Sequence, residues 1–118
     1  MHASRQGGAD IWLRQFPRRE PVWGRCPFVF DPDERRYNFL AVYDDLPKES
    51  QGKFAKGSEV LACAKEHTIL ITSEPSSIKQ YGRKFVAQFG SVLTSQSESV
   101  LPHRDAIRSQ PAMHWFYG

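Results

Sequence analysis

Glu74 is the residue whose type and position in this sequence best suit chemistry. It is the only acid in the polar stretch 73–77, which directly follows the β-branched, apolar run 68–72. A carboxylate at the end of a strand can accept a proton from a substrate hydroxyl. The sequence therefore indicates Glu74 as a candidate general base.

A structural role is the alternative for Glu74. Ser76 or Ser77 could begin a helix, and Pro75 suits a first helical turn because its missing N–H is not needed there. A carboxylate beside a helix N-terminus is stabilised in its ionised form by the helix dipole. The residues by themselves leave both roles open.

Asp44 and Asp45 form a second candidate, directly after the apolar run 39–43. They could bind a metal ion or a sugar hydroxyl. Neighbouring carboxylates point in different directions, however, so a shared metal ion is disfavoured and a solvated turn is the favoured interpretation.

Other chemistry finds little support in the residue spacings. The four histidines have no metal-ligand spacing, and Cys26 and Cys63 lie too far apart to indicate a zinc site or a disulfide framework. No glycine-rich phosphate loop is present. We therefore expect no metal site, no cofactor and no self-contained nucleotide site.

The hydrophobic pattern predicts the elements that position these residues. Strands are expected at 28–30, 39–43, 68–72 and 91–94, and the continuous runs at 39–43 and 68–72 are typical of strands buried on both faces. The pattern also predicts a short helix at 60–64 and a loop at 48–57.

A longer helix is expected before the last strand. Apolar residues recur there at helical spacing, and Gly90 sits where a left-handed cap would end the helix: Ile78, Tyr81, Phe85, Val86, Phe89. On this helix Lys79, Arg83 and Lys84 would form a polar side that could reach a phosphate, although a solvated face is more common.

Alternating strands and helices indicate an α/β domain with a mostly parallel, Rossmann-like sheet flanked by helices. Ligands bind such sheets beyond the carboxyl ends of the strands, which selects 44–45 and 73–74 as the places for chemistry. The aromatic run 115–117 could stack on a sugar or pack inside the protein.

Length and composition set limits on the function. With 118 residues, 40% hydrophobic and 13% aromatic, the chain suits one domain at 11–118 after a flexible lead-in at 1–10. Apolar runs are too short for a membrane span. A net charge of +3 with scattered arginines argues against nucleic acid as a partner. The polar first residues lack an apolar leader, so a cytoplasmic location is expected.

The chain resembles the amino-terminal, acceptor-side half of the family-ten glycosyltransferases, the fucosyltransferase family, over roughly residues 11–118. The stretches that carry the resemblance are 23–30, 42–47, 72–79, 81–85, 88–96, 109–111 and 115–118. Within them Thr72-Ser73-Glu74 matches a strand-end motif of the T-x-E type that contains the family's proposed general base.

This resemblance implies a two-domain, B-type glycosyltransferase fold and an inverting transfer of a sugar from a guanine-nucleotide donor to an acceptor glycan. Glu74 would be the base, and Ser73, Lys79 and Tyr81 are candidate acceptor contacts. The donor-binding half has no counterpart in these 118 residues, so the chain alone is expected to be inactive. The alternative is a non-catalytic α/β binding or scaffold module.

Overall fold

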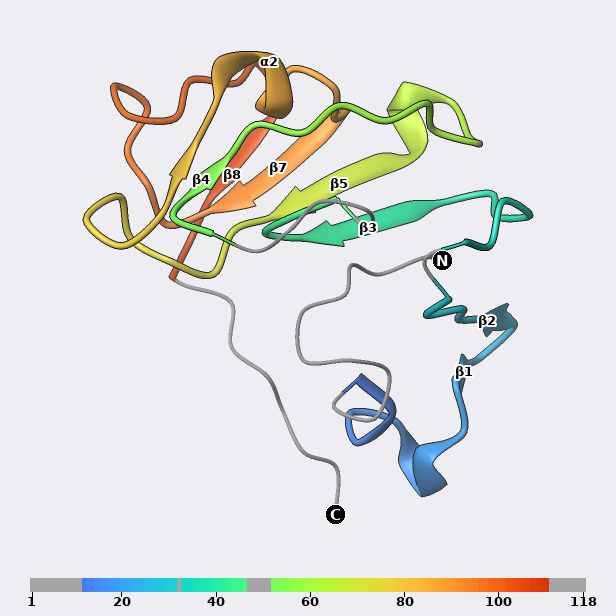
Figure 1. The fold of residues 1–118 in the computed structure, drawn as a ribbon. Helices are drawn as coiled ribbons and strands as arrows, with labels where there is room; N and C mark the ends of the chain where they lie inside the picture. The colour runs from blue at the N-terminus through green and yellow to red at the C-terminus, as the bar shows by residue number, and fades with distance from the viewer. Residues whose placement is uncertain (1–11, 32, 47–51, 111–118) are drawn as a thin grey trace.

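A four-stranded parallel sheet forms the centre of the structure (Figure 1). The computed structural model describes residues 12–31, 33–46 and 52–110. Within them the strands lie side by side in the order β3 (Leu40–Tyr43), β5 (Thr68–Ile71), β7 (Ser91–Thr94) and β8 (Ala106–Arg108). The spatial order follows the chain order, so the carboxyl ends of the four strands share one edge.

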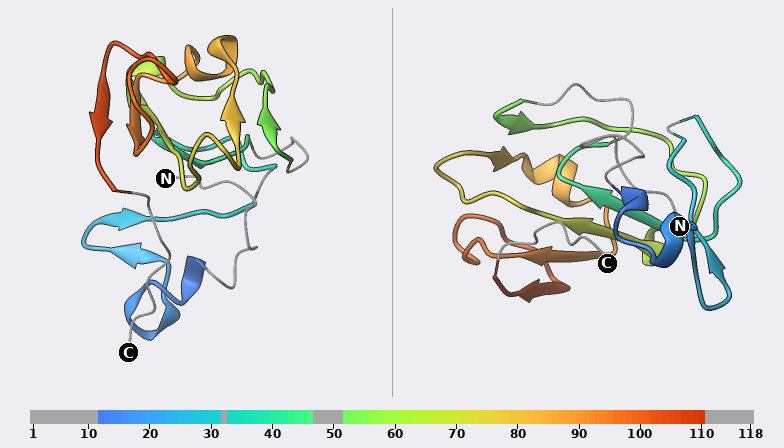
Figure 2. Two further views of the ribbon diagram at one scale, coloured as in Figure 1. Left: turned by 90° about the vertical axis from the view of Figure 1, so that its left-hand side faces the viewer. Right: turned by 90° about the horizontal axis from the view of Figure 1, so that it is seen from below.

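The two faces of this sheet are covered differently (Figure 2). On one face lie the single-turn helix α2 (Arg83–Val86) and a small parallel pair, β4 (Phe54–Ala55) with β6 (Gln80–Tyr81). On the other side of β3 lie the short 3-10 helix η1 (Pro17–Arg19) and an antiparallel pair, β1 (Val22–Trp23) with β2 (Cys26–Pro27). A second 3-10 helix, η2 (Lys65–His67), leads into β5.

The core lies between the sheet and α2. Leu40, Val42, Leu70 and Val92 are fully or almost fully buried and alternate along their strands, so they point to one face of the sheet. Phe85 and Phe89 pack on that face, with ring centroids 5.3 Å apart in an edge-on arrangement. Burial of this apolar surface is the main force that holds α2 against the sheet.

The structure confirms three of the predicted strands and their parallel pairing, as β3, β5 and β7. The strand predicted at 28–30 is wrong, because β2 ends at Pro27 and the stretch 28–30 contributes only an isolated bridge at Val29. The strand β8 was not predicted. It is short, and Ile107 within it is 57% exposed, so it lacks the apolar pattern of a buried strand.

The prediction of a long helix from Ile78 to Phe89 is wrong. A turn follows Pro75, whose carbonyl accepts the N–H groups of Ile78 and Lys79 at 3.0 Å, and Tyr81 then lies in β6. The Gly82 N–H donates to the Ala55 carbonyl at 2.7 Å, which extends the pairing with β4. Helical residues therefore begin only at α2.

The short helix expected at 60–64 is also wrong. These residues are irregular, Val60 is 82% exposed, and the Ala62 N–H donates to the Tyr37 hydroxyl at 3.0 Å. The loop expected at 48–57 contains β4, while residues 48–51 lie outside the described residues. The lead-in predicted at 1–10 lies outside them too. In the part of the chain that is described, no helix has the length and hydropathy needed to cross a membrane.

Gly90 serves close packing instead of a left-handed cap. Among the described glycines only Gly24 has a positive φ. A Cβ atom at Gly90 would lie 2.4 Å from the Lys65 carbonyl oxygen, and the Gly90 N–H donates to the Thr68 hydroxyl at 2.9 Å. Glycine is therefore required where the end of the α2 segment passes over η2.

Substituting Gly90→Ala should lower the free energy of unfolding by about 1–3 kcal/mol, because a backbone oxygen cannot move aside as a flexible side chain can. Chemical denaturation followed by circular dichroism measures this. Gly52→Ala is the matched control, because a Cβ atom at Gly52 meets nothing within 4 Å. Equal stability of the two variants would contradict the packing argument.

Candidate functional site

The chain turns sharply at the carboxyl end of β3. Asp44 adopts a φ of 67°, and the Asp45 N–H donates to the Tyr43 carbonyl at 2.9 Å, which closes a three-residue turn. Aspartate tolerates this left-handed backbone better than most residues. Asp44 is 0% exposed and Asp45 is 4% exposed. The solvated turn expected here is therefore wrong, and both carboxylates need partners inside the protein.

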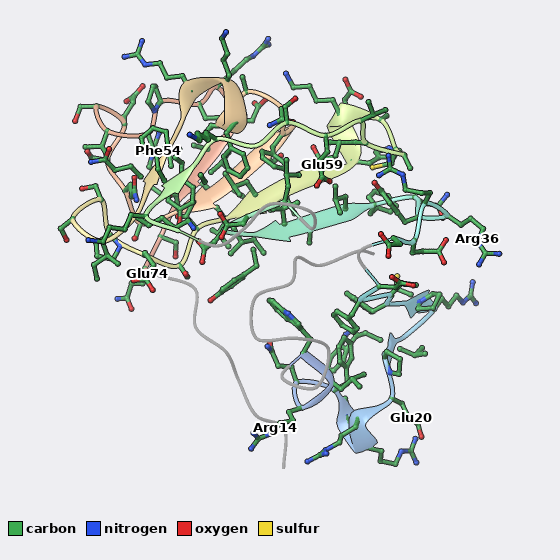
Figure 3. All side chains as sticks on the ribbon, viewed as in Figure 1. Arg14, Glu20, Arg36, Phe54, Glu59 and Glu74 are labelled. Atoms are coloured by element: carbon green, nitrogen blue, oxygen red, sulfur yellow. The ribbon has the colours of Figure 1, made fainter. Side chains whose placement is uncertain are left out.

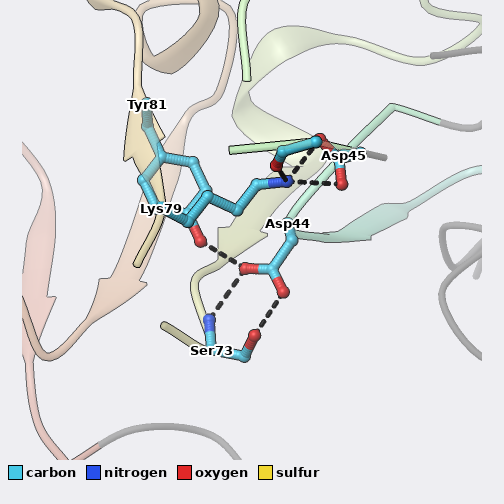
Figure 4. A network of polar contacts seen from close by, with 6 residues as sticks. Asp44, Asp45, Ser73, Lys79 and Tyr81 are labelled. Carbon is cyan, nitrogen blue, oxygen red and sulfur yellow. Dashed lines mark hydrogen bonds and ion pairs between the residues drawn. The ribbon is translucent and has the colours of Figure 1, made fainter. Parts of the chain in front are cut away.

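Asp44 is the centre of a buried hydrogen-bond network (Figure 4). Its carboxylate accepts the Ser73 backbone N–H at 2.8 Å and also accepts the hydroxyls of Ser73 and Tyr81. Three donors compensate the loss of water around this charge. Burial raises the pKa of the Tyr81 hydroxyl well above its usual value, and the hydrogen bond to Asp44 raises it further.

Asp45 forms a buried ion pair with Lys79. The Lys79 ammonium lies 2.7 and 2.9 Å from the two Asp45 carboxylate oxygens, and it donates to the Gly52 carbonyl at 2.7 Å. Lys79 is 6% exposed, so the prediction of a helix face that presents it to solvent or phosphate is wrong. Arg83 and Lys84 do lie in α2 and are exposed.

The turn that carries Glu74 is also held from the β7 side. The Gln96 side-chain amide donates to the carbonyls of Glu74 and Lys79, at 3.0 and 3.1 Å. The Thr72 hydroxyl donates to the Thr94 hydroxyl at 2.7 Å. The backbone on both sides of the Glu74 side chain is thus fixed to the ends of β3 and β7.

Glu74 itself is half-buried, and its side chain projects from the carboxyl edge of the sheet (Figure 3). Among the described residues, none donates a hydrogen bond to its carboxylate or pairs with it. No helix begins at 75–78, so the helix-capping alternative is wrong. The geometry presents an unpaired carboxylate on a fixed backbone, which is the arrangement that a general base requires.

Tyr43 lies beside Asp44 and Glu74, and it was not among the candidate residues predicted from the sequence. Burial raises the pKa of its hydroxyl, the nearby charges of Asp44 and Glu74 raise it further, and a hydrogen bond with Ser73 acts in the opposite direction. Its ring packs edge-on against Trp12, with centroids 5.1 Å apart. Its position just before Asp44, at the end of a predicted strand, was the available signal.

The structure brings six of the sequence-predicted residues to one edge of the sheet: Asp44, Asp45, Ser73, Glu74, Lys79 and Tyr81. Ser73, Lys79 and Tyr81 use their polar groups inside the network, so their role as acceptor contacts stays a prediction. Gln96 and Thr94, which complete the support, were missed because amide and hydroxyl side chains have no diagnostic spacing. The aromatic run 115–117 lies outside the described residues.

The histidines within the described residues lie elsewhere. His67 packs against the Phe39 ring, with ring centroids 4.6 Å apart, and the His103 Nε2 atom lies 2.8 Å from the Phe89 carbonyl oxygen. Across residues 12–31, 33–46 and 52–110, no three histidine, cysteine or acidic side chains gather as a metal site would need.

Removal of one partner from the buried ion pair should destabilise the fold strongly. Lys79→Met removes the cation that pairs with the buried Asp45 charge and should cost about 3–5 kcal/mol of unfolding free energy, while the double variant Asp45→Leu with Lys79→Met should cost less. Thermal and chemical unfolding measure both. The surface pair of Arg18 and Glu20, whose side chains are 83% and 62% exposed, supplies the control, because Arg18→Met should change little. A double variant less stable than Lys79→Met would contradict the assignment.

Tyr81→Phe should destabilise the protein by about 1.5–3 kcal/mol near pH 7, because it removes a hydrogen bond to a buried charge. The folded pKa of Tyr81 is raised, so its contribution is complete below pH 10 and declines as the pH rises above 10. The difference in unfolding free energy between the variant and the parent should therefore shrink by about 1.4 kcal/mol per pH unit above 10. Urea unfolding at pH 7 to 11 measures it, and a constant gap would refute the buried contact.

Comparisons with known proteins do not place the chain in a family. No protein-family model matches it, and searches of curated proteins and of solved structures find no match.

Proposed function

We propose that this chain is the acceptor-side domain of a fucosyltransferase-like glycosyltransferase, with Glu74 as the general base. The proposal depends on a contrast at Glu74. The backbone around Glu74 is anchored, because the Ser73 N–H donates to Asp44 and the Glu74 carbonyl accepts the Gln96 amide. The Glu74 carboxylate, in contrast, has no partner among the described residues. The sequence resemblance supplies the reaction.

In this mechanism the Glu74 carboxylate accepts the proton of an acceptor-glycan hydroxyl as that oxygen attacks the anomeric carbon of the donor sugar. A bond forms between the acceptor oxygen and the anomeric carbon, and the bond from that carbon to the guanine nucleotide breaks. The nucleotide leaves with the electron pair, and the proton stays on Glu74. Attack from the side opposite the leaving group inverts the anomeric centre.

Ser73, Lys79 and Tyr81 have a supporting role in this proposal. Their polar groups hold the turn against Asp44 and Asp45, so they position Glu74. A fixed base needs no reorganisation when the acceptor binds, which is an advantage for a proton transfer. The donor-binding residues and the second domain of a B-type fold come from the resemblance and belong to the proposal alone.

Acceptor binding can be tested on the chain itself. Titration with fucosyl-acceptor oligosaccharides, followed by NMR, should shift the backbone amides of Ser73 and Glu74 more than those of α2, because the acceptor hydroxyl must approach the Glu74 carboxylate. Failure of every acceptor glycan to shift these amides would contradict the proposal.

The base role is tested by Glu74→Gln in the whole gene product that carries this chain. With guanine-nucleotide fucose and an acceptor glycan, kcat should fall about 10²–10⁴-fold, and the acidic limb of the kcat/KM pH profile should disappear. Stability should stay within about 0.5 kcal/mol, because the removed charge has no partner among the described residues.

Glu98→Gln is the matched control, because Glu98 is an exposed glutamate in the connection from β7 to β8. It should leave turnover unchanged. Undiminished turnover by Glu74→Gln would refute the base assignment. Glycan binding by the chain without any sugar transfer by the gene product would instead support the alternative, a non-catalytic binding module.

A further inference from the structure

The segment 12–30 lies on the side of the sheet opposite α2 (Figure 2). An aromatic cavity of about 250 Å³ is lined by residues of this segment and of the sheet. Its walls are the rings of Trp12, Phe16, Trp23, Phe28 and Phe30 on one side and Tyr43 with its sheet neighbours on the other. Among the described residues, no charged side chain lines it.

The rings in these walls support one another. The Phe16 and Phe28 centroids lie 4.9 Å apart, and the Trp12 ring meets both Tyr43, at 5.1 Å, and Phe30, at 6.2 Å. These distances fall in the range of favourable aromatic pairs. These ring contacts therefore support the walls of the cavity.

Gln15 also lines this cavity, and its side-chain amide has a hydrogen-bond donor that is not satisfied. Its Nε2 atom is the one buried side-chain nitrogen or oxygen among the described residues that has no hydrogen-bond partner. Buried amide groups almost always have partners, because desolvation without a hydrogen bond is costly. An acceptor atom on a bound molecule would supply the missing partner.

We propose that this cavity binds a neutral, apolar ring that carries a single hydrogen-bond acceptor, which takes the Gln15 amide N–H. An apolar cavity of about 150 Å³ holds benzene, so this volume holds a ring with a short substituent. A free sugar fits poorly, because most of its hydroxyls would be buried without partners. An ionic ligand would find no opposite charge among the described lining residues.

The test compares acetophenone with ethylbenzene, which have the same ring and chain length and differ in the carbonyl oxygen. Both should bind the chain, and acetophenone should bind about 5–10-fold more tightly because of one hydrogen bond. NMR titration reports the sites through the indole N–H signals of Trp12 and Trp23 and the side-chain amide of Gln15.

Two variants make the test specific. Gln15→Leu should abolish the preference for acetophenone and leave the affinity for ethylbenzene within about twofold, while Gln110→Leu, at an exposed glutamine, should leave the preference intact. Trp23→Ala removes a side chain of the cavity wall that is 58% exposed, so the fold should tolerate the change. This variant should bind both compounds more weakly. Circular dichroism confirms that each variant is folded.

The proposal fails if neither compound shifts these signals at millimolar concentration, if the two bind equally to the parent chain, or if glucose displaces them. Self-association of the chain that Trp23→Ala abolishes would also overturn it, because a second copy would then occupy the cavity. The inference does not rest on the proposed function: the binding assay involves no sugar transfer, so either proposal can fail without the other.

Discussion

The burial of two adjacent carboxylates at the end of β3 is the constraint on which the candidate site depends. An ionised carboxylate removed from water costs several kcal/mol unless donors replace the water. Asp44 takes its donors from Ser73 and Tyr81, and Asp45 takes its donor from Lys79. All three partners lie between β5 and the start of α2. That segment must therefore return to the end of β3, and Glu74 lies within the part that is held there.

This constraint also explains why the chain forms the strand β6 at Gln80–Tyr81 and not a helix. Lys79 and Tyr81 are two residues apart, and both must reach the same pair of aspartates. Side chains at positions i and i+2 point to the same side of a strand, whereas in a helix they diverge by about 200°. With Lys79 directly before β6 and Tyr81 within it, each carboxylate has its partner, and pairing with β4 satisfies the backbone hydrogen bonds of β6. A helix over the same residues would leave one buried charge without its partner.

The sequence was sufficient for the elements whose signal is local. The continuous apolar runs predicted β3 and β5, the short stretch 91–94 predicted β7, and the alternation with helical patterns predicted a mostly parallel sheet. The strand-end rule selected 44–45 and 73–74. The spacing of Tyr81, Phe85 and Phe89 was ambiguous, because the same residues bury their rings from a strand, a single helical turn and the turn after it. Sequence spacing could not reveal the burial of Asp44, because its partners lie 29 and 37 residues away.

Tyr43 lies between the aromatic cavity and the candidate site at the carboxyl edge of the sheet. Its ring forms part of the aromatic cavity wall against Trp12, while its hydroxyl lies beside Ser73 and within the field of Asp44 and Glu74. The side chain has only two rotatable bonds between the backbone and the ring, and the backbone is fixed in β3. The position of the hydroxyl is therefore set by the same side-chain conformation that places the ring against Trp12. One side chain thus contacts both Trp12 in the N-terminal segment and Ser73 beside Glu74.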